Sequence, residues 1–174
     1  MIREKKLFFA WQQAKEKEYL EQKALNGFLL TKVGFGYYEF EESEPKDMVY
    51  EFDFRVISKK ELKEYLELFT DWELVMQYGG WLYFRKERTL NNEIYNDNSS
   101  KKEMFRRLIG FILLTGFPLY YQVLIMFPRL RESGGLSTFY LYFRPLVYFI
   151  LLLHTYALVK LLLILRSYNR SFKE

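Results

Sequence analysis

The chain has 174 residues, a formal net charge of +4 and no cysteine, which excludes disulfides, thiolate nucleophiles and cysteine-ligated zinc. Its single histidine, His154, lies in an apolar run, which excludes a soluble histidine-based triad or metal site. Residues 1–98 carry a net charge of −4 and residues 99–174 a net charge of +8, so the basic balance belongs to the second half. In the first half lysines alternate with glutamates, as in Lys15–Glu18, which is typical of a solvated helix face. Nucleic-acid binding is therefore not expected.

Residues 1–90 predict a cytosolic α+β domain made of a duplicated strand-helix-strand-strand unit, with about six strands and two helices on one face. The two copies match at an offset of 46 residues. Lys17–Glu21 recurs as Lys63–Glu67, and Gly34-Phe35 is matched by Gly80-Trp81. In the first copy we expect a strand, a helix and a hairpin turn at Lys6–Trp11, Ala14–Leu25 (ended by Gly27) and Gly34–Gly36.

The second copy has the clearer pattern. Apolar and charged residues alternate from Tyr50 to Val56, which predicts a half-buried strand whose Glu51 and Asp53 face solvent. Ser58–Glu61 is a capping box that opens a helix with an apolar stripe, and Gly79-Gly80 predicts a hairpin turn. The acidic pair Glu41/Glu42 is also expected to be solvated. Neither acidic pair has the setting of a glycosidase site.

Residues 91–100 are polar and predict a linker to a membrane hairpin at residues 101–174. Two apolar runs, about 108–127 and 145–165, have the length that a helix needs to cross a bilayer. Pro118 falls inside the first run, and Pro145 is expected in the first turn of the second. The hairpin predicts a multi-pass protein of the cell membrane with two spans.

Basic residues predict the orientation of the hairpin, with both termini in the cytoplasm. The connector, residues 128–144, carries three arginines, whereas the outer flanks of the two runs carry seven basic residues. These membrane-orienting residues are Lys101, Lys102, Arg106, Arg107, Arg166, Arg170 and Lys173. Those at 101–107 are also expected to attract the anionic inner leaflet of the lipid bilayer.

Three polar residues within the runs are intramembrane candidates: His154, Lys160 and Gln122. The functional alternative for His154 is an ionisable site. The structural alternative is a neutral imidazole bonded across the hairpin to Tyr120, Tyr121 or Gln122. Neither run contains an acidic residue, so proton or ion translocation by this hairpin is not expected.

Five segments carry a family resemblance: Lys5–Phe9, Glu18–Leu20, Ala24–Leu30, Gly36–Phe40 and Tyr50–Asp53. They resemble the bacterial family known as domain of unknown function 2812, whose members have a cytosolic aromatic-rich domain followed by two membrane spans. Members commonly carry tryptophan where this chain has Tyr19. The resemblance implies a Gram-positive source, a gene near a PadR-type transcriptional regulator, and a role in envelope or drug-stress regulation. The architecture also resembles the duplicated small-molecule-binding domains of the gyrase-inhibitor-like class.

The chain thus combines a complete globular unit with a membrane hairpin and lacks a catalytic constellation. We expect a non-enzymatic, membrane-anchored module, without cofactor or metal, that binds a ligand or partner and serves sensing or regulation. The partner would be another protein or a second copy of the chain. The alternative is an accessory subunit of a larger membrane complex such as a transporter. An enzyme would have to use acids such as Asp53, Asp71 and Glu73.

Overall fold

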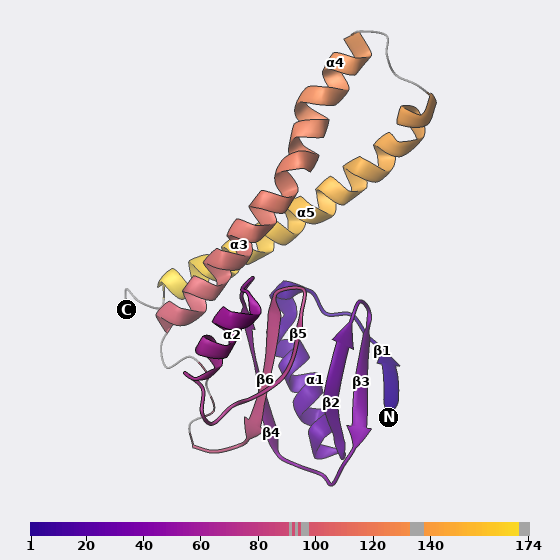
Figure 1. The fold of residues 1–174 in the computed structure, drawn as a ribbon. Helices are drawn as coiled ribbons and strands as arrows, with labels where there is room; N and C mark the ends of the chain where they lie inside the picture. The colour runs from indigo at the N-terminus through magenta and orange to yellow at the C-terminus, as the bar shows by residue number, and fades with distance from the viewer. Residues whose placement is uncertain (91, 93, 95–97, 133–137, 171–174) are drawn as a thin grey trace. The chain divides into compact units, whose positions relative to one another are not determined.

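The computed structural model describes the chain except for residues 91, 93, 95–97, 133–137 and 171–174 (Figure 1). The chain forms two compact units, Met1–Met104 and Phe105–Glu174. The described part of the first unit contains six strands and two α-helices, and the second is built from long apolar helices. This arrangement confirms the predicted α+β class followed by two apolar helices.

The first unit repeats one order of elements, β1-α1-β2-β3 and then β4-α2-β5-β6 (Figure 1). The strands pair antiparallel in two three-stranded sheets of order β1-β3-β2 and β4-β6-β5, so both copies have the same topology. The bounds are β1 Ile2–Lys5, α1 Gln13–Leu25, β2 Phe28–Gly34, β3 Tyr37–Glu42, β4 Met48–Phe54, α2 Lys59–Leu66, β5 Glu73–Tyr78 and β6 Trp81–Glu87. The order strand-helix-strand-strand therefore occurs twice, and the two arrangements match only approximately.

The first strand lies earlier than predicted. It ends at Lys5, and the chain then leads into a short 3₁₀ helix, η1, at Ala10–Gln12. The expectation of a strand at Lys6–Trp11 is wrong because β3 begins only at Tyr37, which pairs with Lys5. Lys6 N still donates to the backbone oxygen of Gly36 in the turn at 3.1 Å, but β3 has no strand residue beyond Tyr37 for the following residues to pair with. The segment between β1 and η1, residues 6–9, lines a pocket.

Both hairpins turn through two residues, but the matched glycines do not occupy equivalent places. The second turn is Gly79-Gly80, with both residues at positive φ. In the first turn the positive φ belongs to Gly36, whereas Gly34 is the last residue of β2. A Cβ on Gly34 would lie 2.2 Å from the Tyr37 ring, so this glycine leaves room for an aromatic side chain.

The core of the unit lies between α1 and strands of both sheets. Leu20 and Ala24 of α1 pack with Leu30, Phe40 and Phe52. The sheets meet where β2 lies beside β5. There a side chain bridges them, because Arg85 Nη1 donates to the backbone oxygen of Leu30 at 3.1 Å.

Helix α2 covers the opposite face of the second sheet. Tyr65 Oη donates to Asp53 of β4, whereas the adjacent Phe52 belongs to the core around α1. Successive residues of a strand point to opposite faces, so the two helices lie on opposite sides of this sheet and not on one face as predicted. Consequently every residue of β4 is buried, and the expectation that Glu51 and Asp53 face solvent is wrong. Glu51 instead forms an ion pair with Lys17.

The predicted start of α2 is confirmed. Ser58 N donates to Glu61 Oε2 at 2.8 Å, and Glu61 N donates to Ser58 Oγ at 3.4 Å, which completes the capping box. The helix buries Tyr65, and beyond its end Phe69 packs against Phe84 of β6. The apolar stripe read from the sequence is therefore the side that contacts the sheet.

Two stretches are long and apolar enough to cross a membrane, Ser100–Leu130, which begins in the last residues of the first unit, and Leu141–Tyr168 in the second unit. The first combines α3 (Asn98–Tyr121), a π-helical segment η2 (Gln122–Met126) and α4 (Phe127–Glu132). The second lies within α5 (Thr138–Arg170). The helices extend beyond the predicted runs, so Pro145 lies inside α5 and not in its first turn. The predicted linker at 91–100 lies largely outside the described residues, and its last three residues already belong to α3.

Candidate ligand-binding site

The first unit contains a pocket of about 300 Å³ where the two copies meet. One wall is the segment between β1 and η1, and the others are α1 and the ends of the two hairpins β2-β3 and β5-β6. Both hairpins therefore contribute to one site, the first with its turn and the second with strand residues on either side of its turn. The size is at the lower end of the usual range for small-molecule sites.

Glu16 of α1 supplies the carboxylate that lines this pocket. Its side chain is buried, with a relative exposure of 6%. Two tyrosine hydroxyls donate to the same oxygen, Oε1, from Tyr38 of β3 at 2.6 Å and from Tyr83 of β6 at 2.9 Å. Among the described residues, the other oxygen, Oε2, accepts no hydrogen bond.

The helical period explains why Glu16 is inside. Glu16, Leu20 and Ala24 follow one another at intervals of four residues and are the buried residues of α1. The expectation of a solvated face for Lys15–Glu18 is therefore wrong at Glu16. The apolar stripe of the helix, extended one turn toward its N-terminus, would have identified this residue from the sequence.

Seven of the fifteen residues that line the pocket are aromatic. Two of them are strongly exposed at the mouth, Phe35 at 83% and Phe9 at 48%, and Phe9 stacks on Trp11 with 4.7 Å between ring centroids. Exposed aromatic side chains around a pocket mouth are typical of binding surfaces. The aromatic lining residues are Phe8, Phe9, Phe35, Tyr38, Tyr78, Trp81 and Tyr83.

Burial controls the ionisation of the groups in the pocket. Removal from water raises the pKa of the Glu16 carboxyl, and the hydrogen bonds from Tyr38 and Tyr83 oppose this effect without cancelling it. Burial and the nearby Glu16 charge raise the pKa of the Tyr38 and Tyr83 hydroxyls above their ordinary value. Both hydroxyls therefore remain protonated donors at physiological pH.

Two further polar side chains line the pocket. The Nε2 atom of Gln13, one turn before Glu16, is buried and has no hydrogen-bond partner among the described residues. Lys6 is exposed, and its ammonium lies 4.1 Å from the ring centroid of Tyr19, a residue outside the pocket lining. The amide could serve a ligand as a donor, whereas the ammonium is already placed over an aromatic ring.

The family model described as Protein of unknown function (DUF2812) matches residues 12–117, more than half of the chain. The chain belongs to this family. The match takes in the first unit from the end of η1 onward and most of α3, and it confirms the resemblance read from the sequence. No curated protein and no solved structure matches the chain significantly.

The acids considered for an enzyme do not come together in this DUF2812 protein. Asp53 is fully buried and accepts hydrogen bonds from Tyr65 Oη and Arg55 Nε, each at 2.8 Å. Asp71 and Glu73 line a separate polar hollow of about 240 Å³ that does not include Asp53. Within the described ranges, no group of three potential ligand side chains could hold a metal ion.

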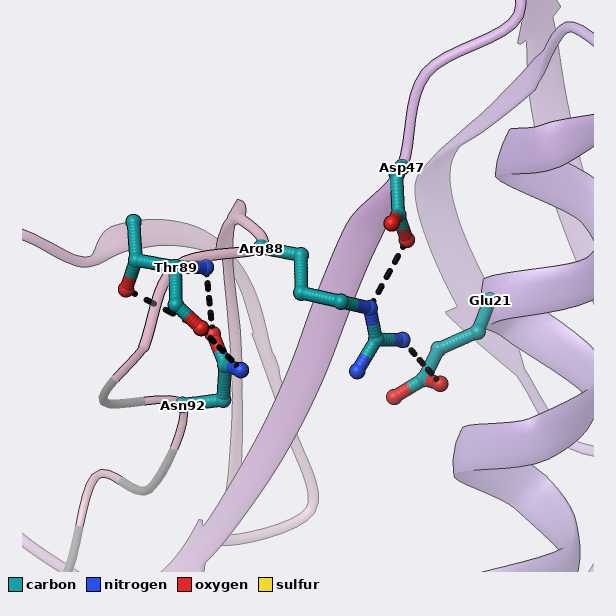
Figure 2. Close-up of polar contacts among 5 residues, drawn as sticks. All are labelled: Glu21, Asp47, Arg88, Thr89 and Asn92. Atoms are coloured by element: carbon teal, nitrogen blue, oxygen red, sulfur yellow. Dashed lines mark hydrogen bonds and ion pairs between the residues drawn. The ribbon is translucent and has the colours of Figure 1, made fainter.

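In this DUF2812 chain, Arg88, the first residue after β6, contacts α1. Arg88 donates from Nε to Asp47 at 2.9 Å and from Nη2 to Glu21 of α1 at 2.8 Å (Figure 2). The following turn is closed by Thr89 N, which donates to Asn92 Oδ1 at 2.6 Å (Figure 2). One helix therefore carries both the pocket carboxylate and a contact to the segment that leads toward α3.

His154 contacts the neighbouring helix of the hairpin. Its Nε2 lies 2.9 Å from the backbone oxygen of Ile112, and its Nδ1 lies 3.3 Å from the Tyr120 hydroxyl. A Cβ on Gly116 would lie 2.2 Å from the imidazole, so this glycine makes room for the ring. The contact with Tyr120 is the one named in the structural alternative for His154.

The other membrane candidates are spread along the helices. Gln122 opens the π-helical segment, and Lys160 lies with its ammonium 5.5 Å from the Tyr156 ring centroid. The basic residues at 101–107 lie in the first turns of α3, and those at 166 and 170 lie at the end of α5. Lys173 lies outside the described residues.

Proposed function

We propose that this chain is a non-enzymatic, membrane-anchored sensing or regulatory module, and that its first unit binds a small ligand in the pocket next to Glu16. The two apolar helices anchor this unit at the cytoplasmic face of the cell membrane. The observation that carries the proposal is a pocket of about 300 Å³, lined by aromatic rings, with a buried carboxylate on one wall.

The composition of the pocket supports ligand binding. Small-molecule sites are mostly apolar and contain a few polar groups that fix orientation. Here Glu16 and the unpartnered amide of Gln13 are such groups within an aromatic lining. Exposed Phe35 at the mouth adds apolar surface that an entering ligand would cover.

The chemistry of the pocket favours binding over catalysis. General acid–base catalysis needs groups that exchange protons near the working pH. Tyr38 and Tyr83 hold their protons because their pKa values are raised, and the only carboxylate lining the pocket is Glu16. A single hydrogen-bonded carboxylate is a good anchor for a ligand but has no nucleophile or second acid beside it.

Helix α1 provides a route from the pocket to the rest of the chain. Glu16 lies in its first turn, and Glu21 contacts Arg88 at the exit of the unit. A ligand that binds Glu16 would therefore act on the helix that also holds the exit segment. This connection supports a sensing role over simple storage of a ligand.

The test uses the full chain in phosphatidylcholine nanodiscs, with small naphthyl compounds of different charge as probes. Ala10 lines the pocket, and Ala10→Phe adds a ring there, whereas Ala14→Phe adds the same ring at an exposed position of α1 outside it. We expect calorimetry to detect binding of at least one probe to the wild type and to Ala14→Phe, and a loss of about tenfold or more in Ala10→Phe. Failure of every probe to bind, or equal binding by both variants, would refute the proposal.

A further inference from the structure

The Glu16 carboxylate lines the proposed ligand pocket and has one oxygen that is not used as an acceptor by the described residues. Both tyrosine hydroxyls bond Oε1, and Oε2 has no hydrogen-bond partner among the described residues. A buried carboxylate is costly unless its charge is compensated. No described cation pairs with Glu16, in contrast to the buried Glu51 and Glu39, which have Lys17 and Arg3 as partners.

Aromatic rings that line the same pocket also favour a positive charge on a ligand. The face of an aromatic ring carries partial negative charge and attracts a cation within about 6 Å of its centroid. Trp81, the strongest cation–π partner by residue type, lines the pocket together with Phe35, whereas Phe8 already has the Lys6 ammonium 5.4 Å from its ring centroid. Carboxylate and rings therefore favour the same charge on a ligand.

Among the titratable groups of the pocket, the buried charged group is negative, so a ligand with a positive charge would balance it. They are Glu16, Lys6, Tyr38, Tyr78 and Tyr83. Lys6 is the only cation among them. It is exposed, and its ammonium lies 4.1 Å from the ring centroid of Tyr19, outside the lining, and 5.4 Å from that of Phe8, within it. The hydroxyls of Tyr38 and Tyr83 keep their protons and are neutral, because their pKa values are raised. Of the two charged groups, Glu16 is therefore the buried one.

We infer that the ligand is an organic monocation, an ammonium group carried by an aromatic or apolar body of one or two rings, with its positive end at Glu16 Oε2. This inference rests on the proposed ligand-binding function of the same pocket. The apolar body fills the aromatic lining, and the buried Gln13 amide can donate to a polar atom of that body. A volume of about 300 Å³ limits the ligand to a compact molecule.

The experiment compares three compounds that share one naphthylmethyl body and differ in charge: the trimethylammonium salt, the neutral methyl sulfone and the sulfonate. Binding to the full chain in phosphatidylcholine nanodiscs is measured by calorimetry, with empty nanodiscs as the reference. We expect the cation to bind about tenfold or more tightly than the sulfone, and the sulfonate to bind weakest. Lowering the pH should weaken the cation alone, because protonation removes the Glu16 charge.

Glu16→Gln removes the charge and keeps an oxygen that can accept from both tyrosines. We expect it to abolish the preference for the cation while sulfone affinity stays the same. The matched control, Glu39→Gln, changes another buried glutamate outside the pocket and should retain the preference. Should Glu16→Gln fail to fold, the pH series on the wild type gives the same discrimination.

The outcomes separate the two proposals. Equal binding of all three compounds, or a cation preference that survives Glu16→Gln and low pH, would refute the cationic ligand while leaving the pocket a ligand site. Absence of binding by all three compounds would refute both the ligand class and the proposed function.

Discussion

At the scale of single residues, the burial of Glu16, the proposed ligand anchor, has a cost in stability. Its carboxyl is buried beside two tyrosine hydroxyls, and burial raises its pKa above the ordinary value of 4.5. A sequence reading based on alternating lysine and glutamate assigns Glu16 to solvent. This assignment is wrong because the helical period decides which side chain faces the core, whatever the charges of its neighbours in the sequence.

The raised pKa predicts how stability changes with pH. Between the unfolded and folded pKa values of Glu16, the folded state binds more protons, so its stability falls as the pH rises from about 4.5 through the folded pKa. Glu16→Gln removes this loss. We expect the variant to melt at a higher temperature than the wild type at pH 8, with the difference shrinking toward pH 4.

Thermal unfolding of the full chain in nanodiscs measures this effect. Glu18→Gln changes an exposed glutamate on the same helix and serves as the control, with the same melting temperature as the wild type at every pH. A Glu16→Gln variant that is less stable than the wild type at pH 8 would mean that the charged side chain contributes favourably to folding.

At the scale of elements, the sequence predicts the order of strands and helices better than their packing. The capping box at Ser58 and the turn at Gly79-Gly80 are local signals, and the structure confirms both. The placement of α2 opposite α1 depends on contacts such as that between Tyr65 and Asp53, which join residues 12 positions apart. Periodicity alone does not specify which side of a sheet a helix covers.

Gly27, just after the end of α1, allows a prediction of how much stability an alanine substitution there would cost. Gly27 has a φ of +82°, and a Cβ there would lie 2.8 Å from the backbone oxygen of Ser43. Gly79 has a φ of +56° and no neighbour within 4 Å. We expect Gly79→Ala to cost about 1 kcal/mol, or roughly 5 °C in melting temperature, and Gly27→Ala at least twice as much. Equal losses would show that the contact with Ser43 relaxes without cost.

At the scale of the whole molecule, the first unit, with its proposed ligand pocket, is followed by two apolar helices. Composition predicts these helices well, because the apolar runs 108–127 and 145–165 contain a single charged residue, Lys160. The pocket could not be predicted in this way, since its lining comes from five separate segments of the first unit that only folding brings together. The hairpin determines in which compartment that pocket would meet its ligand.

Labelling from outside the cell tests this central claim most directly, and the absence of native cysteine makes it clean. Glu44→Cys places a thiol in the loop between β3 and β4, and Ser133→Cys places one in the connector between the two apolar stretches. In intact cells, a membrane-impermeant maleimide should label Ser133→Cys and should reach Glu44→Cys only after permeabilisation. Labelling of Glu44→Cys in intact cells, with Ser133→Cys protected, would contradict the account.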